Sequence, residues 1–454
     1  MTRFAEDGQI EAYTTRSSAP PGVPVELKVS TTERAYRVSA YRIGAYDGGT
    51  GHLVGRSELV AGRRQPGPVF QPAETRTVVA PWDVSVTLGT EGWEPGFYVL
   101  RLATTSGWEH QVPYIVSSPS AAGTVALVVP VTTWQAYNVW GGYSLYEGPP
   151  GDRRSWAVSF DRPYLGVGGM NDFRTAVVPI VIRAEATGVP LSYFANLDLH
   201  DRQDLLAGAL GYVSTGHDEY WTPSMRRTVE NARDAGTNLA FLGANTAYWR
   251  IRLGDRSTGP RRLVTGYRHD AALDPMREEE PEEATGRFRD APSADPENEL
   301  AGVLYECYPV DADFVVTSPR WWGFAGTGVR KGSVISGLVG GEADRVYPDR
   351  GTPRPLQVLS HTAYSCRGDA TTSQSVYYTV PSGAGVFTAG TLRWGCALVD
   401  LCDRRLGPET RDFARRVTEN LFRGFARGPV GLRHPARDNV DDFDLPLVNS
   451  VEAS

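Results

Sequence analysis

The pattern of apolar and polar positions changes near residue 118. Before it, short segments alternate apolar with polar residues and are divided by turns rich in Gly, Pro and Asp, for example at 25–29, 36–43 and 96–102. Because side chains of a strand point to alternate faces, this pattern predicts strands that bury one face only. We expect residues 1–118 to form an antiparallel, immunoglobulin-like β-sandwich.

After the small-residue linker 117–123, strands begin to alternate with helices. Three continuous apolar runs are typical of strands buried on both faces: 125–129, 211–213 and 238–242. Helical patterns cover roughly 201–210, 223–235 and 408–426. The alternation predicts an α/β domain with a mainly parallel sheet over 119–430, followed by a C-terminal tail over 431–454.

One strand–helix–strand unit is marked most clearly. Thr222 is a good N-cap residue, Pro223 suits the first helical position, and Gly236 suits the end of the helix. The chain then returns to the apolar run 238–242. The polar loop 214–221 is therefore expected at the carboxyl end of its strand, where open α/β sheets bind ligands.

Residues with chemical potential follow three of the predicted strands. His217 and Glu219 stand two positions apart in an extended segment, so their side chains point to the same side. Asn245 follows the next strand, and Tyr137 follows the strand at 125–129. Carboxyl ends of neighbouring parallel strands meet at one edge, which predicts a site containing a carboxylate, an imidazole, an amide and a phenol.

Tyr137 also belongs to a series of five aromatic residues at spacings of three. Packing is the default role for the members of this series, which are Trp134, Tyr137, Trp140, Tyr143 and Tyr146. For Tyr137 the ligand and core interpretations are about equally supported.

Composition narrows the class of protein. The net charge of -7 argues against nucleic acid as the main partner, and we expect a small-molecule substrate. The sequence contains no run of about 18 apolar residues that could span a membrane. The first residues also lack the apolar core of a secretory signal, so we expect a cytoplasmic protein. The four cysteines show no Cys-x-x-Cys spacing, which favours reduced, buried thiols over a zinc site and leaves Cys366 and Cys396 as candidate neighbours.

The stretch 269–299 is dense in charge and proline, with five glutamates between 278 and 283. A solvated loop is the default interpretation, and a lid or a partner-docking segment are the alternatives.

Several motifs spread over the chain carry a family resemblance: residues 41–49, 133–138, 141–146, 158–164, 216–221, 243–250, 340–344 and 383–390. Together they resemble the large (β) subunit of N,N-dimethylformamidase and its relatives. The resemblance implies a β-sandwich followed by a three-layer α/β domain similar to class I glutamine amidotransferases. It also implies a mononuclear non-haem iron bound by two tyrosines and a glutamate, and a separate small accessory subunit.

The resemblance assigns roles to individual residues. Glu219 matches the glutamate ligand, His217 the catalytic histidine and Asn245 the active-site asparagine. Tyr137 is the match for the first tyrosine ligand.

The second tyrosine ligand departs from the family pattern. Phe160 stands where the phenol is expected, which leaves Tyr164 as its substitute. Glu342 is a candidate second catalytic carboxylate. Three aromatic residues are candidates for the wall of the substrate pocket: Trp134, Trp221 and Phe387.

These residues form a coherent chemical hypothesis. Phenolate and carboxylate are hard oxygen donors that suit ferric iron, which can polarise an amide carbonyl and acidify a bound water. His217 would move protons, Asn245 would donate to the developing oxyanion, and Glu342 would be a proton shuttle. The sequence therefore predicts an iron-dependent hydrolase of a carbon–nitrogen bond in an amide or formamide.

Two alternatives belong to other classes. An open iron centre also serves oxygen chemistry, as in oxidative tailoring enzymes of secondary metabolism, and dependence of turnover on oxygen separates that class from a hydrolase. A metal-free binding protein with an aromatic cleft is the other alternative, which Phe160 favours and metal content would test. Assembly as a homo-oligomer is left open.

Overall fold

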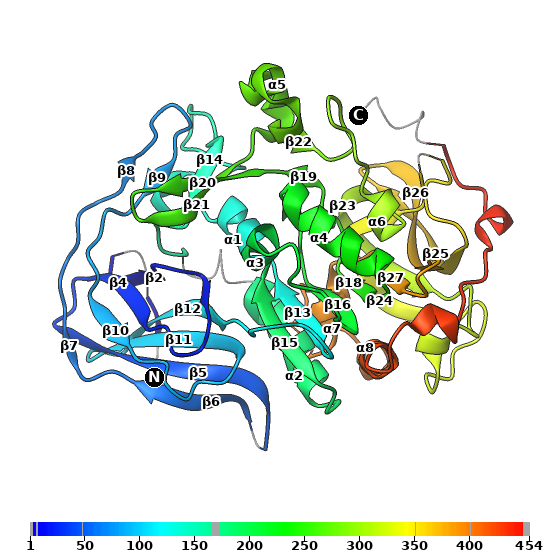
Figure 1. Cartoon of the computed structure of the whole chain (residues 1–454), viewed down its shortest axis with the longest axis horizontal. Helices are drawn as coiled ribbons and strands as arrows, with labels where there is room; N and C mark the ends of the chain where they lie inside the picture. Colours follow the sequence, from blue (N-terminus) through cyan, green and yellow to red (C-terminus); the bar gives the residue numbers. More distant parts are fainter. Residues whose placement is uncertain are drawn as a thin grey trace.

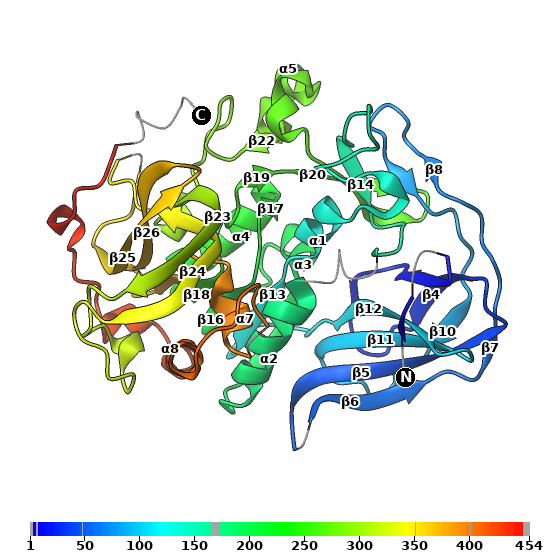
Figure 2. The same cartoon turned by 180° about the vertical axis from the view of Figure 1, so that it is seen from behind.

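The computed structural model describes residues 3–5, 8–47, 49–165, 172–349, 351–399 and 401–447. Figure 1 shows the N-terminal strands gathered on one side of the molecule and the central sheet with its helices on the other. Figure 2 shows the same division from behind.

Two N-terminal sheets pack against each other. The larger is built on β5 (Ala35–Tyr46), β6 (Gly49–Arg56), β11 (Gly96–Thr104) and β12 (Trp108–Val116), which pair antiparallel in the order β12-β11-β5-β6. The smaller contains β2 (Ile10–Thr14), β4 (Val25–Thr31) and β10 (Val86–Leu88). Leu27 of one sheet and Leu100 of the other belong to one buried cluster, so the alternating pattern buries a shared core. The expectation of N-terminal antiparallel strands is confirmed.

A seven-stranded sheet forms the centre of the rest of the chain. Its strands are, in order, β15 (Leu191–Ala195), β13 (Val125–Val129), β16 (Gly211–Thr215), β18 (Asn238–Leu242), β27 (Gly385–Thr388), β26 (Asp369–Thr379) and β25 (Leu356–Cys366). The first five run parallel, and β26 and β25 pair antiparallel at one end. The expected mainly parallel sheet is present.

Helices cover both faces of this sheet. Leu127 and Val129 of β13 lie in one buried cluster, whereas Ala126 and Val128 lie in another, as the alternation of a strand requires. The first cluster includes residues of α2 (Val178–Glu185) and α8 (Pro408–Phe425), and the second those of α3 (Asn196–Asp201) and α4 (Pro223–Asp234).

The predicted strand–helix–strand unit forms as expected. Thr222 Oγ1 accepts a hydrogen bond from the Met225 amide at 3.2 Å, Pro223 is the first residue of α4, and Gly236 follows the helix with a φ of 104°. The loop with His217 and Glu219 therefore leaves the carboxyl end of β16.

The helix expected over 201–210 is wrong. The chain forms α3 over Asn196–Asp201 instead and then turns. The Asp198 carboxylate accepts a hydrogen bond from the Ala195 amide at 2.9 Å, which fixes the helix start, and Gly208 adopts a φ of 70°.

The acidic stretch is an anchored arm and not a simple loop. It contains short helical turns, including α5 (Met276–Glu279), which projects at the top of Figure 1. Asp274 anchors the arm because its carboxylate accepts hydrogen bonds from Arg252 at 2.6 and 2.9 Å and from the Thr285 amide at 2.8 Å. The glutamates between 278 and 283 remain exposed.

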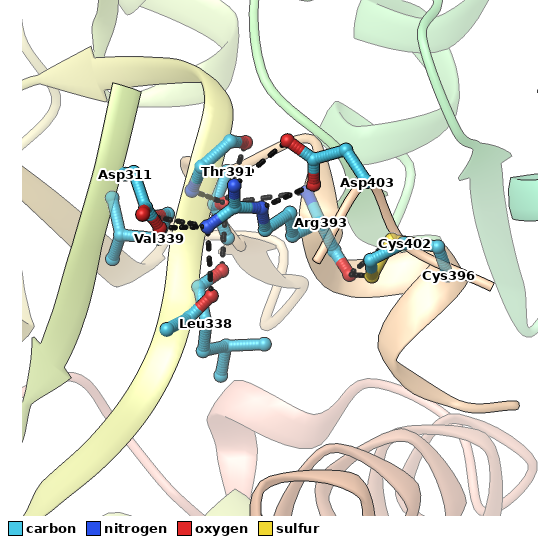
Figure 3. The surroundings of a disulfide bond; sticks show 10 residues. Asp311, Leu338, Val339, Thr391, Arg393, Cys396, Cys402 and Asp403 are labelled. Carbon is cyan, nitrogen blue, oxygen red and sulfur yellow. Dashed lines mark hydrogen bonds and ion pairs between the residues drawn. A yellow bond between two sulfur atoms is a disulfide. The ribbon is translucent and has the colours of Figure 1, made fainter. Parts of the chain in front are cut away.

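All four cysteines are paired, so the expected reduced thiols are wrong. Cys307 of β23 (Leu304–Val315) bonds Cys366, and Cys396 bonds Cys402, with Cα–Cα distances of 6.4 and 4.9 Å. Cys366 and Cys396 are not partners. Figure 3 shows the second disulfide beside Arg393, whose guanidinium joins Asp403 and Asp311.

No helix in the described ranges is long and apolar enough to cross a membrane.

The Cys396–Cys402 disulfide should stabilise the fold by restricting the unfolded chain. Cys402→Ser is expected to lower the free energy of unfolding by about 2 kcal/mol, because the bond closes a loop with a sequence separation of 6. Urea denaturation of the oxidised proteins measures this difference. In excess dithiothreitol the variant and the wild type should become similar. Reactive thiols in denatured, unreduced wild type would contradict the pairing.

Candidate functional site

The Glu219 carboxylate is the centre of a cluster of polar side chains. Glu219 is 2% exposed, and its amide donates to Thr133 Oγ1 at 3.1 Å, which fixes the loop after β16. Tyr137, the last residue of α1 (Val131–Tyr137), donates its hydroxyl to Oε2 at 2.8 Å. Asn245 donates Nδ2 to Oε1 at 3.2 Å. The structure thus brings together residues that follow three different strands.

Tyr146 completes the cluster and was assigned to packing by its place in the aromatic series. Its hydroxyl lies 2.7 Å from the Tyr137 hydroxyl and 3.0 Å from both oxygens of Glu219. The two phenol rings stack, with centroids 4.2 Å apart and planes at 24°.

A tight reversal of the chain brings Tyr146 to this position. Gly141 and Gly142 adopt φ values of 76° and 86°, a backbone conformation that side chains disfavour, and the Leu145 amide then donates to the Ala136 carbonyl at 3.0 Å. Tyr146 consequently returns beside Tyr137. The pair of glycines was the sequence signal for this reversal.

Tyr164 lies elsewhere. It lines a small buried pocket with Gln135, Phe160 and Arg162, between the N-terminal sheets and α1. Within the described ranges, no hydrogen bond joins Tyr164 to Glu219. The structure therefore brings Tyr146, and not Tyr164, to the carboxylate as the second phenol.

His217 lies between two carboxylates. Its Nε2 is 3.4 Å from Glu219 Oε2 and 3.1 Å from Glu342 Oε2, where Glu342 belongs to β24 (Val334–Arg345). Burial alone would lower the pKa of His217, but the charges of Glu342, Glu219 and Asp172 outweigh it and raise the pKa to about 10. The neighbouring carboxylates therefore favour the protonated form of the imidazole.

Asp344 supports the site from the same strand as Glu342. Asn245 has a left-handed backbone with a φ of 57°, and its amide donates to Asp344 Oδ1 at 2.9 Å. Burial raises the pKa of Asp344 to about 7, against the hydrogen bond from Asn245. Sequence reasoning missed Asp344, although its spacing of two from Glu342 could have indicated it.

The three aromatic residues expected in the substrate pocket are buried, and their role as pocket walls stays a prediction. Trp134 lies edge-on to Phe173, and Phe387 stacks on Trp321. Trp221 belongs to the buried cluster on the α3 and α4 side of the sheet, because it follows Tyr220 in an extended segment and points the opposite way.

Other aromatic residues surround the cluster. Tyr220 lies edge-on to Tyr137 and stacks on Trp249. Tyr248 meets Trp249 and Tyr305 edge-on.

The donor set fits a hard metal ion. Two phenol oxygens and a carboxylate lie within 3.0 Å of one another. The buried Oδ1 of Asn245 has no hydrogen-bond partner among the described residues. Burial, followed by the charge of Glu219, raises the pKa of both phenols above their usual range, and a bound cation would oppose this shift.

The described part of the chain contains no group of three or more His, Cys, Asp or Glu side chains that could hold a metal ion. Phenols are outside that set, and the hard oxygen donors of Tyr137, Tyr146 and Glu219 are of the kind that ferric iron accepts.

The chain matches a known family model over residues 37–405, described as N,N-dimethylformamidase beta subunit-like, C-terminal. The chain belongs to this N,N-dimethylformamidase β-subunit-like family. Membership agrees with the resemblance carried by the sequence motifs, and the family name indicates a hydrolase of the amidase type. No curated protein matches this family member.

One of the matching solved structures is a Paenibacillus sp. cycloisomaltooligosaccharide glucanotransferase complexed with cycloisomaltoheptaose. It shares 11% identity and a TM-score of 0.16, and the match covers 54% of this family member and 29% of that chain. A similarity this low carries no argument about fold or function.

Asp344 should make stability depend on pH. Its pKa is raised from 3.8 to about 7, so the native state keeps a proton that the unfolded state loses, and stability falls as pH rises from about 4 to about 7. Asp344→Asn should prevent up to about 4 kcal/mol of this loss of stability at high pH, because asparagine does not titrate. The variant is expected to be close to wild type at pH 4.5 and more stable at pH 8 in urea denaturation.

Asp441, whose side chain is 87% exposed, provides the control. Asp441→Asn should leave the pH dependence unchanged. An Asp344→Asn variant with the wild-type pH profile would contradict the burial of a protonated carboxyl.

Proposed function

We propose that this chain is a metal-dependent hydrolase that cleaves the carbon–nitrogen bond of an amide or formamide. The observation that carries the proposal is the convergence of Tyr137, Tyr146 and Glu219 beside His217 at the carboxyl end of β16. The family, named for a dimethylformamidase, supports the same reaction class.

Tyr137, Tyr146 and Glu219 would hold the metal, for which we propose iron. When bound, the ion would supply a Lewis acid for the substrate carbonyl and lower the pKa of a bound water. The role of second phenol passes from Tyr164 to Tyr146 in this proposal, because only Tyr146 contacts the carboxylate.

We infer that His217 and Glu342 move protons. Hydrolysis adds water to the carbonyl carbon, breaks the bond to nitrogen, and transfers a proton to the departing amine. His217, whose protonated form is favoured by its carboxylate neighbours, would donate that proton at Nε2. Glu342, whose Oε2 lies 3.1 Å from this nitrogen, would accept a proton from the attacking water and return it to His217.

We infer that Asn245 orients the reacting carbonyl. Its Nδ2 donates to Glu219, and its backbone is fixed by Asp344, so its amide is held rigidly at the cluster. A donor fixed in this way would stabilise the oxyanion without reorganisation.

The alternatives are less well supported. Phe160 favoured a metal-free binding cleft, but Tyr146 provides the second phenol that Phe160 lacks. Oxidative tailoring chemistry would keep the iron and change the reaction, and dependence of turnover on oxygen distinguishes it from hydrolysis.

Finer assignments accompany this proposal. Two face-packed N-terminal sheets support the immunoglobulin-like sandwich, and helices on both faces of the central sheet support the glutamine amidotransferase-like domain. The domain limits at 118 and 430 stay predictions. The family is that of a β subunit, which supports a small accessory subunit as partner. The cytoplasmic location stays a prediction, against which the two disulfides weigh.

Metal content provides the first test. Purified wild type, analysed by plasma mass spectrometry, should contain near-stoichiometric iron and show a visible tyrosinate-to-iron charge-transfer band. Tyr137→Phe, Tyr146→Phe and Glu219→Gln should each lose most of the iron and the band, because each removes an oxygen donor. Tyr164→Phe is the matched control and should retain both. Wild type without metal after reconstitution would contradict the proposal.

His217 provides the second test, in the iron-loaded protein with a panel of small amides, with and without oxygen. His217→Ala should lower kcat about 10²- to 10⁴-fold because the proton donor is lost. The exposed His52→Ala is the control and should match wild type. Turnover that requires oxygen would favour the oxidative alternative.

A further inference from the structure

Arg268 lies against the phenol pair, although it belongs to none of the strand ends that build the site. It is the first residue of a short helical turn, Arg268–Leu273, at the base of the acidic arm. The side chain is buried, and its Nη1 donates to the Leu145 carbonyl at 2.6 Å. The bond therefore holds the residue that directly precedes Tyr146.

The guanidinium also covers a phenol ring. Its central carbon lies 3.5 Å from the centroid of the Tyr146 ring and 4.8 Å from that of Trp249. Tyr137 stacks on the same phenol at 4.2 Å. Two planar groups cannot occupy one face of a ring at these distances, so Arg268 covers the face opposite Tyr137. The order of the stack is Arg268, Tyr146, Tyr137.

The closest contacts of Arg268 are with the Tyr146 ring and the Leu145 carbonyl, and its charge also interacts with that of Glu219. In the described part of the chain, no acidic side chain lies within ion-pair distance of Arg268, and its buried Nε has no hydrogen-bond partner. Buried Arg262 pairs with Asp161 at 2.9 Å, whereas buried Arg250, like Arg268, donates to backbone carbonyls. A buried charge is ordinarily stabilised by a side chain of opposite charge.

The backbone of Arg268 is also unusual. Its φ of 55° lies in the left-handed region, which residues other than glycine rarely adopt unless surrounding contacts hold them there. The hydrogen bond to the Leu145 carbonyl and the contacts with the Tyr146 and Trp249 rings fix the side chain. They therefore also hold the backbone in this conformation.

We propose that Arg268 is a positioning residue that holds the Tyr146 hydroxyl at Glu219 by clamping the ring against Tyr137. The planar guanidinium sets the position of the ring, and the bond to the Leu145 carbonyl sets the position of the backbone. The role in metal binding rests on the proposed function, whereas the role in ordering the phenol pair does not.

The experiment compares Arg268→Met and Arg268→Lys in the full chain, with two readouts. The first is the near-ultraviolet circular dichroism of the metal-free protein, from which the spectrum of the corresponding Tyr146→Phe protein is subtracted to isolate the contribution of the ordered phenol pair. The second is iron affinity. Each variant should lose part of the circular dichroism signal, and each should bind iron roughly 10- to 100-fold more weakly than wild type. Lysine should not rescue either readout, because it lacks the planar fork that stacks and donates.

A double-mutant comparison separates positioning from general loss of stability. If Arg268 acts through Tyr146, then Arg268→Met in a Tyr146→Phe background should cause little further loss of iron affinity. Arg250→Met is the matched control, because Arg250 is also buried and stacks on an aromatic ring, that of Phe288 at 4.8 Å. It should leave the phenol signal and iron affinity at wild-type values.

The outcomes distinguish the two proposals. Wild-type circular dichroism in both Arg268 variants would overturn the positioning role, and so would full additivity with Tyr146→Phe. Absence of iron binding in every protein, including wild type, would contradict the proposed function. The metal-free circular dichroism would still decide the role of Arg268. If Arg268→Met fails to fold, Arg268→Lys carries the same test.

Discussion

The burial of the Glu219 carboxylate is the constraint on which the rest of the site depends. A carboxylate that leaves water is stable in its charged form only when donors replace the lost hydration. Tyr137, Tyr146 and Asn245 are those donors, so the carboxylate from the segment after β16 meets two tyrosines from the segment after β13 and an amide from the segment after β18. The order of the central sheet, which places β13, β16 and β18 side by side, is what allows the three segments to reach one point.

The same requirement extends to the residues behind the donors. Asn245 can donate only because its left-handed backbone is fixed by Asp344, which is itself a buried carboxyl. Tyr146 can donate only because the chain reverses at Gly141 and Gly142. Each donor therefore depends on further residues that fix its position, so a compact site needs residues that are distant in sequence.

The sequence predicted the parts of this arrangement that depend on local rules. The cap at Thr222 and the period of two at His217 and Glu219 are properties of a few neighbouring residues, and they sufficed to place the loop after β16. Asn245 and Tyr137 followed from the rule that parallel strands end at one edge. These rules act without knowledge of the remaining chain.

The rest depended on contacts that no local pattern contains. Tyr146 reaches the site through a reversal whose direction depends on packing, so its place in the aromatic series indicated only a core residue. The helix expected over 201–210 was displaced because Asp198 caps an earlier start. The disulfides depend on distances between cysteines in the folded chain and could not be read from cysteine spacing. The position of Trp221 could have been predicted. Successive side chains of an extended segment point to opposite sides, so Trp221 points away from Tyr220.

The pattern of charge distinguishes this cluster from an ordinary structural ion-pair network. Asp161 shows the structural solution in the same protein, because this buried carboxylate is paired with both Arg256 and Arg262 at 2.9 Å. Glu219 and Glu342 instead share one histidine, and Arg268 covers a phenol ring while its charge interacts with that of Glu219. Two buried carboxylates that share one histidine would be stabilised further by a bound cation, and perturbed ionisable groups of this kind are common at reactive sites. The contrast between the two sites therefore supports a reactive role for the Glu219 cluster.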